Sequence, residues 1–216
     1  MNWMLLILVE MAGAQGFSLP RPGQQVDQEG VRMCVRAVGE AWSDAHISQV
    51  YRSGVLAGGV GLVLPLHDYF VMDLEMTYKR SAGNELALED SQSTNIGSAL
   101  ELVPITAVLE ARWPMAGGGE IYTGVGPSFT VFKEEHSQRL DTGLQVTQGT
   151  KVATDFRVGV RVDTGLAQPS MAPNIGRQLQ AIEFEFYLGR RWQLHRKQIG
   201  FNLSAWRGSA GLLFRY

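Results

Sequence analysis

Acidic and basic residues occur at every second position in several segments of this chain, and this spacing limits the chemistry available to them. The segment 152–163 reads V-A-T-D-F-R-V-G-V-R-V-D. Side chains alternate between the two faces of a β-strand, so one face of this segment is apolar and the other carries the charges. Acids and bases on one face can form salt bridges or relay protons and ions. The central question is whether this face lies in water or inside a closed barrel.

The same alternation places fifteen charged side chains, seven basic and eight acidic, on the polar faces of the expected strands. They are Arg32, Arg36, Glu40, Asp73, Glu75, Lys79, Glu110, Arg112, Asp155, Arg157, Arg161, Asp163, Glu183, Glu185 and Arg215. A solvated sheet face would also carry mixed charges, but charges that nearly cancel can pair when buried, as burial requires. In a narrow lumen, a packed salt-bridge core is favoured over a proton or ion path.

Two arginines test this lumen hypothesis most directly. If the charged face of 152–163 lies inside a barrel, Arg157 and Arg161 must find carboxylates there. The candidate partners are Asp155, Glu183 and Glu185.

Other catalytic and metal-binding patterns are weak. The four histidines all fall in expected loops or turns without metal-ligand spacing; they are His46, His67, His136 and His195. The single cysteine, Cys34, excludes an internal disulfide framework and a cysteine-based zinc site. His195 with Ser204 or Ser209 is the one candidate Ser/His pair for lipid hydrolysis, and it lacks a third, orienting group. We expect no catalytic residues, no metal and no cofactor.

Composition narrows the class of protein further. The chain has 216 residues, a net charge of −2 and no basic run, which argues against a nucleic-acid partner. Its 25 glycines suit tight turns and close strand packing. After the N-terminus there is no apolar run of about 18 residues, so no transmembrane helix is predicted. This length suits one all-β domain.

The N-terminal residues are expected to lie outside the domain. Residues 1–9 are largely apolar and Ala12-Gly13-Ala14 resembles a signal-peptidase site, so 1–14 is predicted to be a signal peptide. The absence of a basic residue ahead of the apolar run, and Glu10 inside it, leave a buried first strand or helix as the alternative. Residues 15–30 form an irregular leader.

The remaining chain, 31–216, reads as about eight strands. The predicted strands are 31–42, 54–64, 69–80, 98–113, 120–133, 152–163, 180–192 and a last strand that ends the chain, with a bulge near 206–208. The connections after the first, third and fifth strands are long and polar, whereas those after the second and fourth are short. Outer-membrane barrels show this asymmetry. The connection 165–177 is an exception, too long for a simple turn.

The polar face is also rich in glycine, which favours an inward orientation. A narrow barrel has little interior room, whereas a solvated face has no need of glycine. These glycines are Gly59, Gly61, Gly124, Gly126, Gly159, Gly189 and Gly211. Aromatic residues gather toward strand ends on the apolar face, as in interfacial girdles; they are Phe70, Tyr78, Trp113, Phe129, Trp192, Phe214 and Tyr216. The alternative is a soluble lipocalin-like barrel with its apolar face inward.

Three segments carry a resemblance to a known group of proteins. They are V-P-I-T-A-V-L-E-A-R-W-P at 103–114, I-Y-T-G-V-G-P-S-F at 121–129, and a last strand with Leu212, Phe214 and Tyr216 at alternate positions. Together they resemble the small outer-membrane β-barrel proteins, the OmpA-like and OmpW-like group. Two departures are Pro104 and Pro127, which would each remove a ladder hydrogen bond unless a bulge or a rim absorbs them. Arg190 and Arg191 would mark where a strand leaves the membrane.

The resemblance implies an all-β, eight-stranded, antiparallel up-and-down transmembrane β-barrel over 31–216, integral to the outer membrane of a Gram-negative-type bacterium. It implies membrane lipid as one partner, and the barrel-assembly machinery as another, through an insertion signal formed by Leu212, Phe214 and Tyr216. The expected function is a non-enzymatic structural or surface-interaction role. A narrow pore or conduit for small or hydrophobic molecules is the alternative, and a lipid-acting enzyme is less favoured. No residue pattern identifies a ligand.

Overall fold

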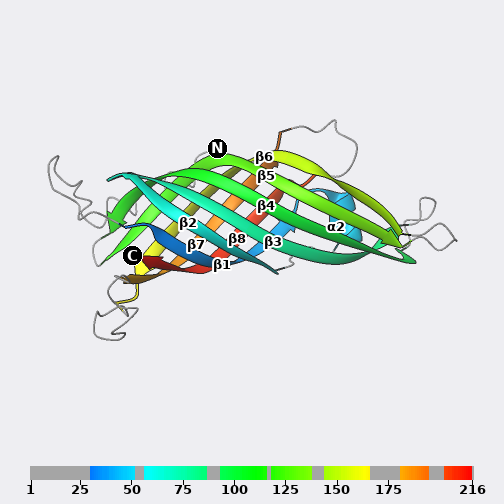
Figure 1. The fold of residues 1–216 in the computed structure, drawn as a ribbon, viewed down its shortest axis with the longest axis horizontal. Coiled ribbons are helices and arrows are strands. Elements are labelled where there is room, and N and C mark those ends of the chain that lie inside the picture. The colour runs from blue at the N-terminus through cyan, green and yellow to red at the C-terminus, as the bar shows by residue number, and fades with distance from the viewer. Residues whose placement is uncertain are drawn as a thin grey trace.

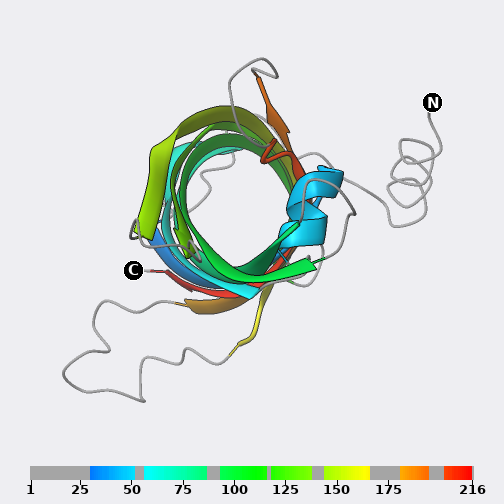
Figure 2. The same cartoon turned by 90° about the vertical axis from the view of Figure 1, so that its right-hand side faces the viewer.

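Eight antiparallel strands form a closed barrel in the computed structural model, in which each strand is hydrogen-bonded to the next and the last to the first (Figures 1 and 2). The structure describes residues 30–51, 56–86, 93–115, 118–137, 144–165, 181–194 and 202–215. The elements are β1 (Arg32–Trp42), α2 (Ala45–Val50), β2 (Leu56–His67), β3 (Phe70–Leu86), β4 (Ser93–Met115), β5 (Gly119–Ser137), β6 (Leu144–Asp163), β7 (Ala181–Gln193) and β8 (Ala205–Arg215). The predicted eight-stranded antiparallel barrel is confirmed.

Some predictions concern residues outside these ranges. The predicted signal peptide (1–14) and leader (15–30) lie outside the described residues apart from Gly30, as does most of the 165–177 connection. They stay predictions. In the part of the chain that the structure describes, no helix is both long and apolar enough to cross a membrane.

The period-two pattern of the strands separates an apolar outer wall from a charged interior. In β7, Glu183 and Glu185 are buried while Phe184 and Phe186 are exposed. In β1, Arg32, Cys34 and Arg36 are buried while Met33 and Val35 are exposed. A soluble lipocalin-like barrel would have the opposite arrangement, with the apolar face inside. The barrel is therefore apolar outside and charged inside.

At one end of the barrel, some strands extend further than the others. We call the end where β1 begins and β8 ends the terminal end, and the opposite one, where α2 lies, the helix end. At the helix end β6 pairs with β5 from Leu144 onward but with β7 only from Ala153 onward, so part of β3–β6 projects beyond the closed barrel (Figure 1). Much of the segments 81–95 and 134–150, predicted as loops, belongs to this projecting sheet. Those predictions are wrong because polar strands can continue pairing once the apolar outer band has ended.

A short helix also replaces part of a predicted loop. Residues 43–53 were expected to form an irregular polar connection, but 45–50 form α2 at the rim of the helix end (Figure 2). Ile47 and Tyr51 are both 2% exposed and point their side chains into the barrel interior's apolar cluster. Tyr51 also forms an isolated β-bridge with Gly83 of β3, where a Cβ atom would lie 2.2 Å from the Val50 carbonyl oxygen. Glycine therefore permits the close approach of α2 to β3.

The predicted bulge in the last strand is wrong. β8 keeps one continuous register against β1 from Arg32–Arg215 to Trp42–Ala205, through the region where the bulge was expected. The prediction counted residues before Ala205 as strand, but the strand begins only at Ala205. The apparent change of alternation is therefore a strand boundary.

The two prolines lie within strands rather than at bulges or rims. The ladder between β3 and β4 is interrupted next to Pro104, and the ladder between β4 and β5 is interrupted next to Pro127. On both sides of each interruption the register is the same. Loss of the proline donor is thus absorbed by a short gap in pairing, without an inserted residue.

Gly126 provides a test of how closely β4 and β5 pack. A Cβ atom at Gly126 would lie 1.8 Å from the carbonyl oxygen of Ala107, whereas one at the outward-facing Gly58 would meet nothing within 4 Å. We expect Gly126→Ala to lower the free energy of unfolding by about 1–3 kcal/mol, the usual range for overpacking. Urea titration of the refolded barrel in detergent, followed by tryptophan fluorescence, measures this. Gly58→Ala is the matched control, and equal losses in the two variants would contradict the packing argument.

Candidate functional site

The barrel interior holds a dense set of charged side chains. Among the described residues, nine basic and eight acidic ones are buried. They are Arg32, Arg36, Lys79, Arg112, Lys151, Arg157, Arg161, Arg191 and Arg207, with Glu40, Asp73, Glu75, Glu110, Glu120, Asp155, Glu183 and Glu185. We refer to these residues as the lumen network. Its near balance of charge lets most of these charges pair inside the protein.

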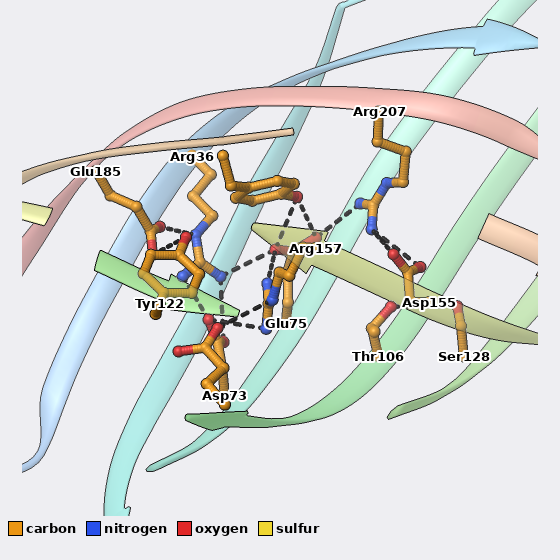
Figure 3. A network of polar contacts seen from close by, with 12 residues as sticks. Arg36, Asp73, Glu75, Thr106, Tyr122, Ser128, Asp155, Arg157, Glu185 and Arg207 are labelled. Atoms are coloured by element: carbon orange, nitrogen blue, oxygen red, sulfur yellow. Dashed lines mark hydrogen bonds and ion pairs between the residues drawn. The ribbon is translucent and has the colours of Figure 1, made fainter. Parts of the chain in front are cut away.

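Arg36 of β1 lies at the centre of the lumen network (Figure 3). Its Nη2 donates to Asp73 Oδ2 at 2.6 Å, its Nη1 to Glu75 Oε2 at 2.9 Å, and its Nε to Glu185 Oε2 at 2.5 Å. Arg157 of β6 approaches the same group, with Nη2 3.0 Å from Asp73 Oδ2 and Nη1 3.3 Å from Glu75 Oε2. Two arginines from β1 and β6, which are not neighbours in the sheet, therefore share the carboxylates of β3.

Toward the terminal end, Arg161 is the main cation. Its Nη2 lies 2.7 Å from Glu110 Oε2, its Nη1 2.8 Å from Glu120 Oε1, and its Nε 2.8 Å from Glu185 Oε1. Arg32 also binds Glu120, at 2.7 Å. Arg161 thereby connects β6 to β4, β5 and β7.

Toward the helix end, Arg191 and Arg207 share two carboxylates. Each lies 3.1 Å from Glu40 Oε1 and 3.1 Å from Asp155 Oδ2. Arg207 also reaches Glu75, with Nη2 2.8 Å from Oε1. These contacts join this layer to the central one.

Two tyrosines complete the polar packing. The Tyr122 hydroxyl donates to Glu185 Oε1 at 2.8 Å, and the Arg161 guanidinium carbon lies 4.0 Å from the centre of the Tyr122 ring. The Tyr187 hydroxyl donates to Glu75 Oε2 at 3.2 Å. The aromatic rings thus provide a hydrogen-bond donor and a π face where arginines crowd together.

An apolar cluster lies above the lumen network at the helix end, and we call it the plug. Its members come from β1, α2, β4, β5 and β8 and from the residues just after α2 and just before β8. They are Trp42, Ile47, Tyr51, Leu100, Leu102, Phe132, Leu203 and Ala205. Lys79 lies at the boundary, with Nζ 3.9 Å from the Trp42 ring centre and 3.6 Å from Glu40 Oε2. The plug and the lumen network therefore fill successive levels of one interior.

The chemistry of this interior is that of a packed ionic core. Glycines provide its space: a Cβ atom at Gly159 would lie 2.7 Å from the Tyr122 hydroxyl oxygen, and one at Gly211 would lie 2.8 Å from Arg36 Cγ. Within the described ranges, no group of three or more His, Cys, Asp or Glu residues could hold a metal ion. The mutual pairing of the central charges favours a fixed salt-bridge core over an ion path.

The structure places thirteen of the fifteen predicted network residues in the buried interior. The other two, Asp163 and Arg215, lie half-buried at the terminal end, 3.6 Å apart. Arg161 pairs with Glu185, one of its predicted partners. Arg157 pairs instead with Asp73, Glu75 and Glu110, because its long side chain extends across the lumen to β3 and β4.

Four buried charged residues were absent from the predicted network. Arg207 was concealed by the incorrect bulge, and Arg191 was interpreted with its neighbour as a membrane exit. Glu120 and Lys151 lie at predicted strand boundaries, where alternation over a few residues is hard to recognise. Continuing the period-two pattern of each strand by a few residues would have found all four.

The candidate Ser/His pair stays a prediction, because its histidine lies outside the described residues. The Ser204 hydroxyl oxygen accepts a hydrogen bond from the backbone N–H of Gln193 at 3.0 Å, while His195 lies outside the described residues. His67 is exposed at the terminal end, beside the Tyr69 ring.

Solved structures share this fold. Neisserial surface protein A matches with a TM-score of 0.54 and 11% identity, over 87% of this chain and 97% of that one. The outer membrane protein OprG from Pseudomonas aeruginosa matches with a TM-score of 0.55 and 10% identity, over 87% and 96% of the two chains. A major outer membrane protein from Thermus thermophilus matches with a TM-score of 0.54 and 12% identity, over 86% and 99%. No family model and no curated protein matches the chain. The predicted resemblance to small outer-membrane barrels is confirmed at the level of fold.

Removal of Arg161 tests whether the lumen network behaves as a fixed ionic core. Arg161→Met keeps an apolar stem but leaves Glu110, Glu120 and Glu185 short of a cation, so we expect a loss of about 3–5 kcal/mol in the free energy of unfolding. The control is Arg80→Met, because the Arg80 side chain is 60% exposed and pairs with Glu101 at 3.5 Å. Its loss should stay below about 1 kcal/mol. Urea unfolding in phospholipid vesicles measures both values, and similar small losses would contradict the ionic-core interpretation.

Proposed function

We propose that this chain is an integral outer-membrane β-barrel protein, non-enzymatic and closed to solutes, with a structural or surface-interaction role. The observation that supports this most directly is the inverted distribution of polarity. Large apolar side chains such as Val35, Val60 and Phe186 are about half exposed on the outer wall, while the lumen network is buried. Lipid around the barrel would cover these side chains, and water would not.

A change in the outward-facing residues marks the proposed membrane boundary at the helix end. In β3, outward Tyr78 is followed by outward Arg80; in β4 and β5 the corresponding outward residues beyond the band are Glu101 and Lys133. Toward the helix end the inward-facing residues change from charged to apolar, as at Leu102. The projecting sheet thus carries charged side chains on its outer face and apolar ones, such as Leu100 and Phe132, on its inner face, as expected for a segment in water. We infer that it extends from the cell surface, where its strands and connections could meet partners.

Cell fractionation tests the proposed location. Expressed with its N-terminal segment in a Gram-negative host, the protein should be recovered with outer membranes and should migrate faster on gels before heating than after it, because a folded barrel resists the detergent. Arg161→Met should unfold at a lower temperature in the same gel assay. Recovery in the soluble fraction without heat-modifiable migration would contradict the proposal.

The alternative, a narrow pore, requires a continuous water path. The lumen network and the plug occupy successive levels of the interior, so we expect no discrete conductance steps when the refolded barrel is inserted into planar bilayers. A known open porin inserted under the same conditions is the positive control. Reproducible single-channel steps from the wild-type protein would support the pore and contradict the closed barrel.

We also propose that β8 carries the insertion signal recognised by the barrel-assembly machinery. Leu212 and Phe214 alternate on its outer face, and Tyr216 lies outside the described residues. We expect Phe214→Ala to lower the amount assembled in cells severalfold while refolding in detergent continues, because recognition precedes folding. Phe184→Ala, an outward aromatic on β7, is the control. Equal cellular losses for both variants would indicate a general packing effect and contradict the signal.

A further inference from the structure

Two consecutive arginines of β7 face opposite sides of the barrel wall. Arg191 is 1% exposed and pairs with Glu40 and Asp155 inside the lumen. Arg190 points outward and is half-buried among apolar side chains. The same side-chain type therefore has two different environments one residue apart, and only the inner one contains carboxylates.

The surroundings of Arg190 are aromatic and aliphatic. Its guanidinium carbon lies 4.7 Å from the centre of the Trp206 ring, and Trp206 is 59% exposed. On β6 the residue in register with Arg190 is Phe156, whose ring lies 6.4 Å from that of Trp192. Leu188 precedes Arg190 on the same outer face. The Arg190 guanidinium thus lies on an exposed apolar surface, where it contacts the ring of Trp206.

Arg190 differs from the other basic side chains on the outer wall. The described residues place three there, and Arg80 and Lys133 each have a carboxylate, Glu101 and Glu135 respectively. No ion pair joins Arg190 to a carboxylate of the described residues. A cation on the lipid face is costly at mid-membrane but costs little near the interface, where an anionic headgroup can approach.

The position of Arg190 matches such an interface. It lies near the end of β7 at the helix end, and Trp206 is the second residue of β8. Tryptophan is enriched at the level of lipid headgroups. On the low side of the barrel, where β7 and β8 are short, these two residues therefore lie close to the helix-end rim of the apolar band.

We propose that Arg190 and Trp206 form a binding site for the phosphate group of an anionic lipid in the leaflet at the helix end. The guanidinium N–H groups donate to phosphate oxygens, for which their planar fork is suited. Trp206 holds the guanidinium by its π face and packs against the upper part of the acyl chains. Leu188, two residues nearer the middle of β7, and Phe156 extend this contact along the chains. This site depends on the proposed membrane location.

Native mass spectrometry of the refolded barrel in micelles containing phosphatidic acid tests the site. We expect Arg190→Gln to raise the Kd of the first bound phosphatidic acid about fivefold, the effect of one arginine at an anionic membrane surface. Arg190→Lys should retain part of the affinity, and Trp206→Leu should raise the Kd about twofold. Arg80→Gln is the matched control and should leave the Kd unchanged. Arg190→Gln should likewise leave unchanged the binding of diacylglycerol, which carries no phosphate group.

The outcomes separate this site from the membrane location itself. Each variant is first checked for heat-modifiable migration, and its absence in the wild type would count against the proposed outer-membrane barrel. A folded barrel whose first phosphatidic acid binds equally well in the wild type and Arg190→Gln would overturn the lipid site alone. Displacement of the lipid by millimolar inorganic phosphate would also overturn it, because the site would then bind free phosphate.

Discussion

Neutralisation of charge inside a narrow, closed lumen is the constraint on which the rest of this structure depends. An unpaired buried charge costs several kcal/mol, so the buried arginines must be placed beside carboxylates. Arg36 on β1 meets this need through β3 and β7, and Arg161 on β6 through β4, β5 and β7. Several of these contacts connect strands that are not neighbours in the sheet, such as β1 with β3 and β7, and β6 with β4. The same network that satisfies the charges thus specifies which walls of the barrel face each other.

Interior volume is the second constraint, and it follows from the first. Arginine and tyrosine side chains need length and room, while the cross-section of an eight-stranded barrel is small. Gly159 leaves space for Tyr122, and Gly211 leaves space for Arg36. A methyl group at either position would meet these side chains within 3 Å. Glycines opposite large side chains therefore leave the room in which the ion pairs form.

Much of this arrangement could be predicted from the sequence, because side chains alternate between the two faces of a strand. A shift of one residue would move each side chain from the lumen to the outer face. The alternation at 152–163 placed Arg157 and Arg161 on one face, and both lie in the lumen. The partners of Arg157 could not be predicted, since they depend on which strands face β6 across the closed barrel. Likewise, the extent of β4 could not be read from hydrophobic alternation, because its inward residues change from Glu110 to Leu102 along one strand. For the same reason α2 was not predicted from the sequence, because its apolar side packs into the interior of the barrel.

This reversal divides the barrel into two parts that follow opposite rules. Between the terminal end and the level of Tyr78, the apolar side chains face outward and the charged ones face inward. In the projecting sheet, by contrast, Leu100 faces inward and Glu101 faces outward. Lys79 lies where the two interiors meet, between the carboxylate of Glu40 and the ring of Trp42. A lysine side chain is compatible with both the charged and the apolar interior. Its aliphatic stem can pack on apolar groups while its ammonium group contacts a carboxylate and an aromatic ring. The change from apolar to charged side chains on the outer wall is thus matched by a change of core inside it, at one level of the barrel.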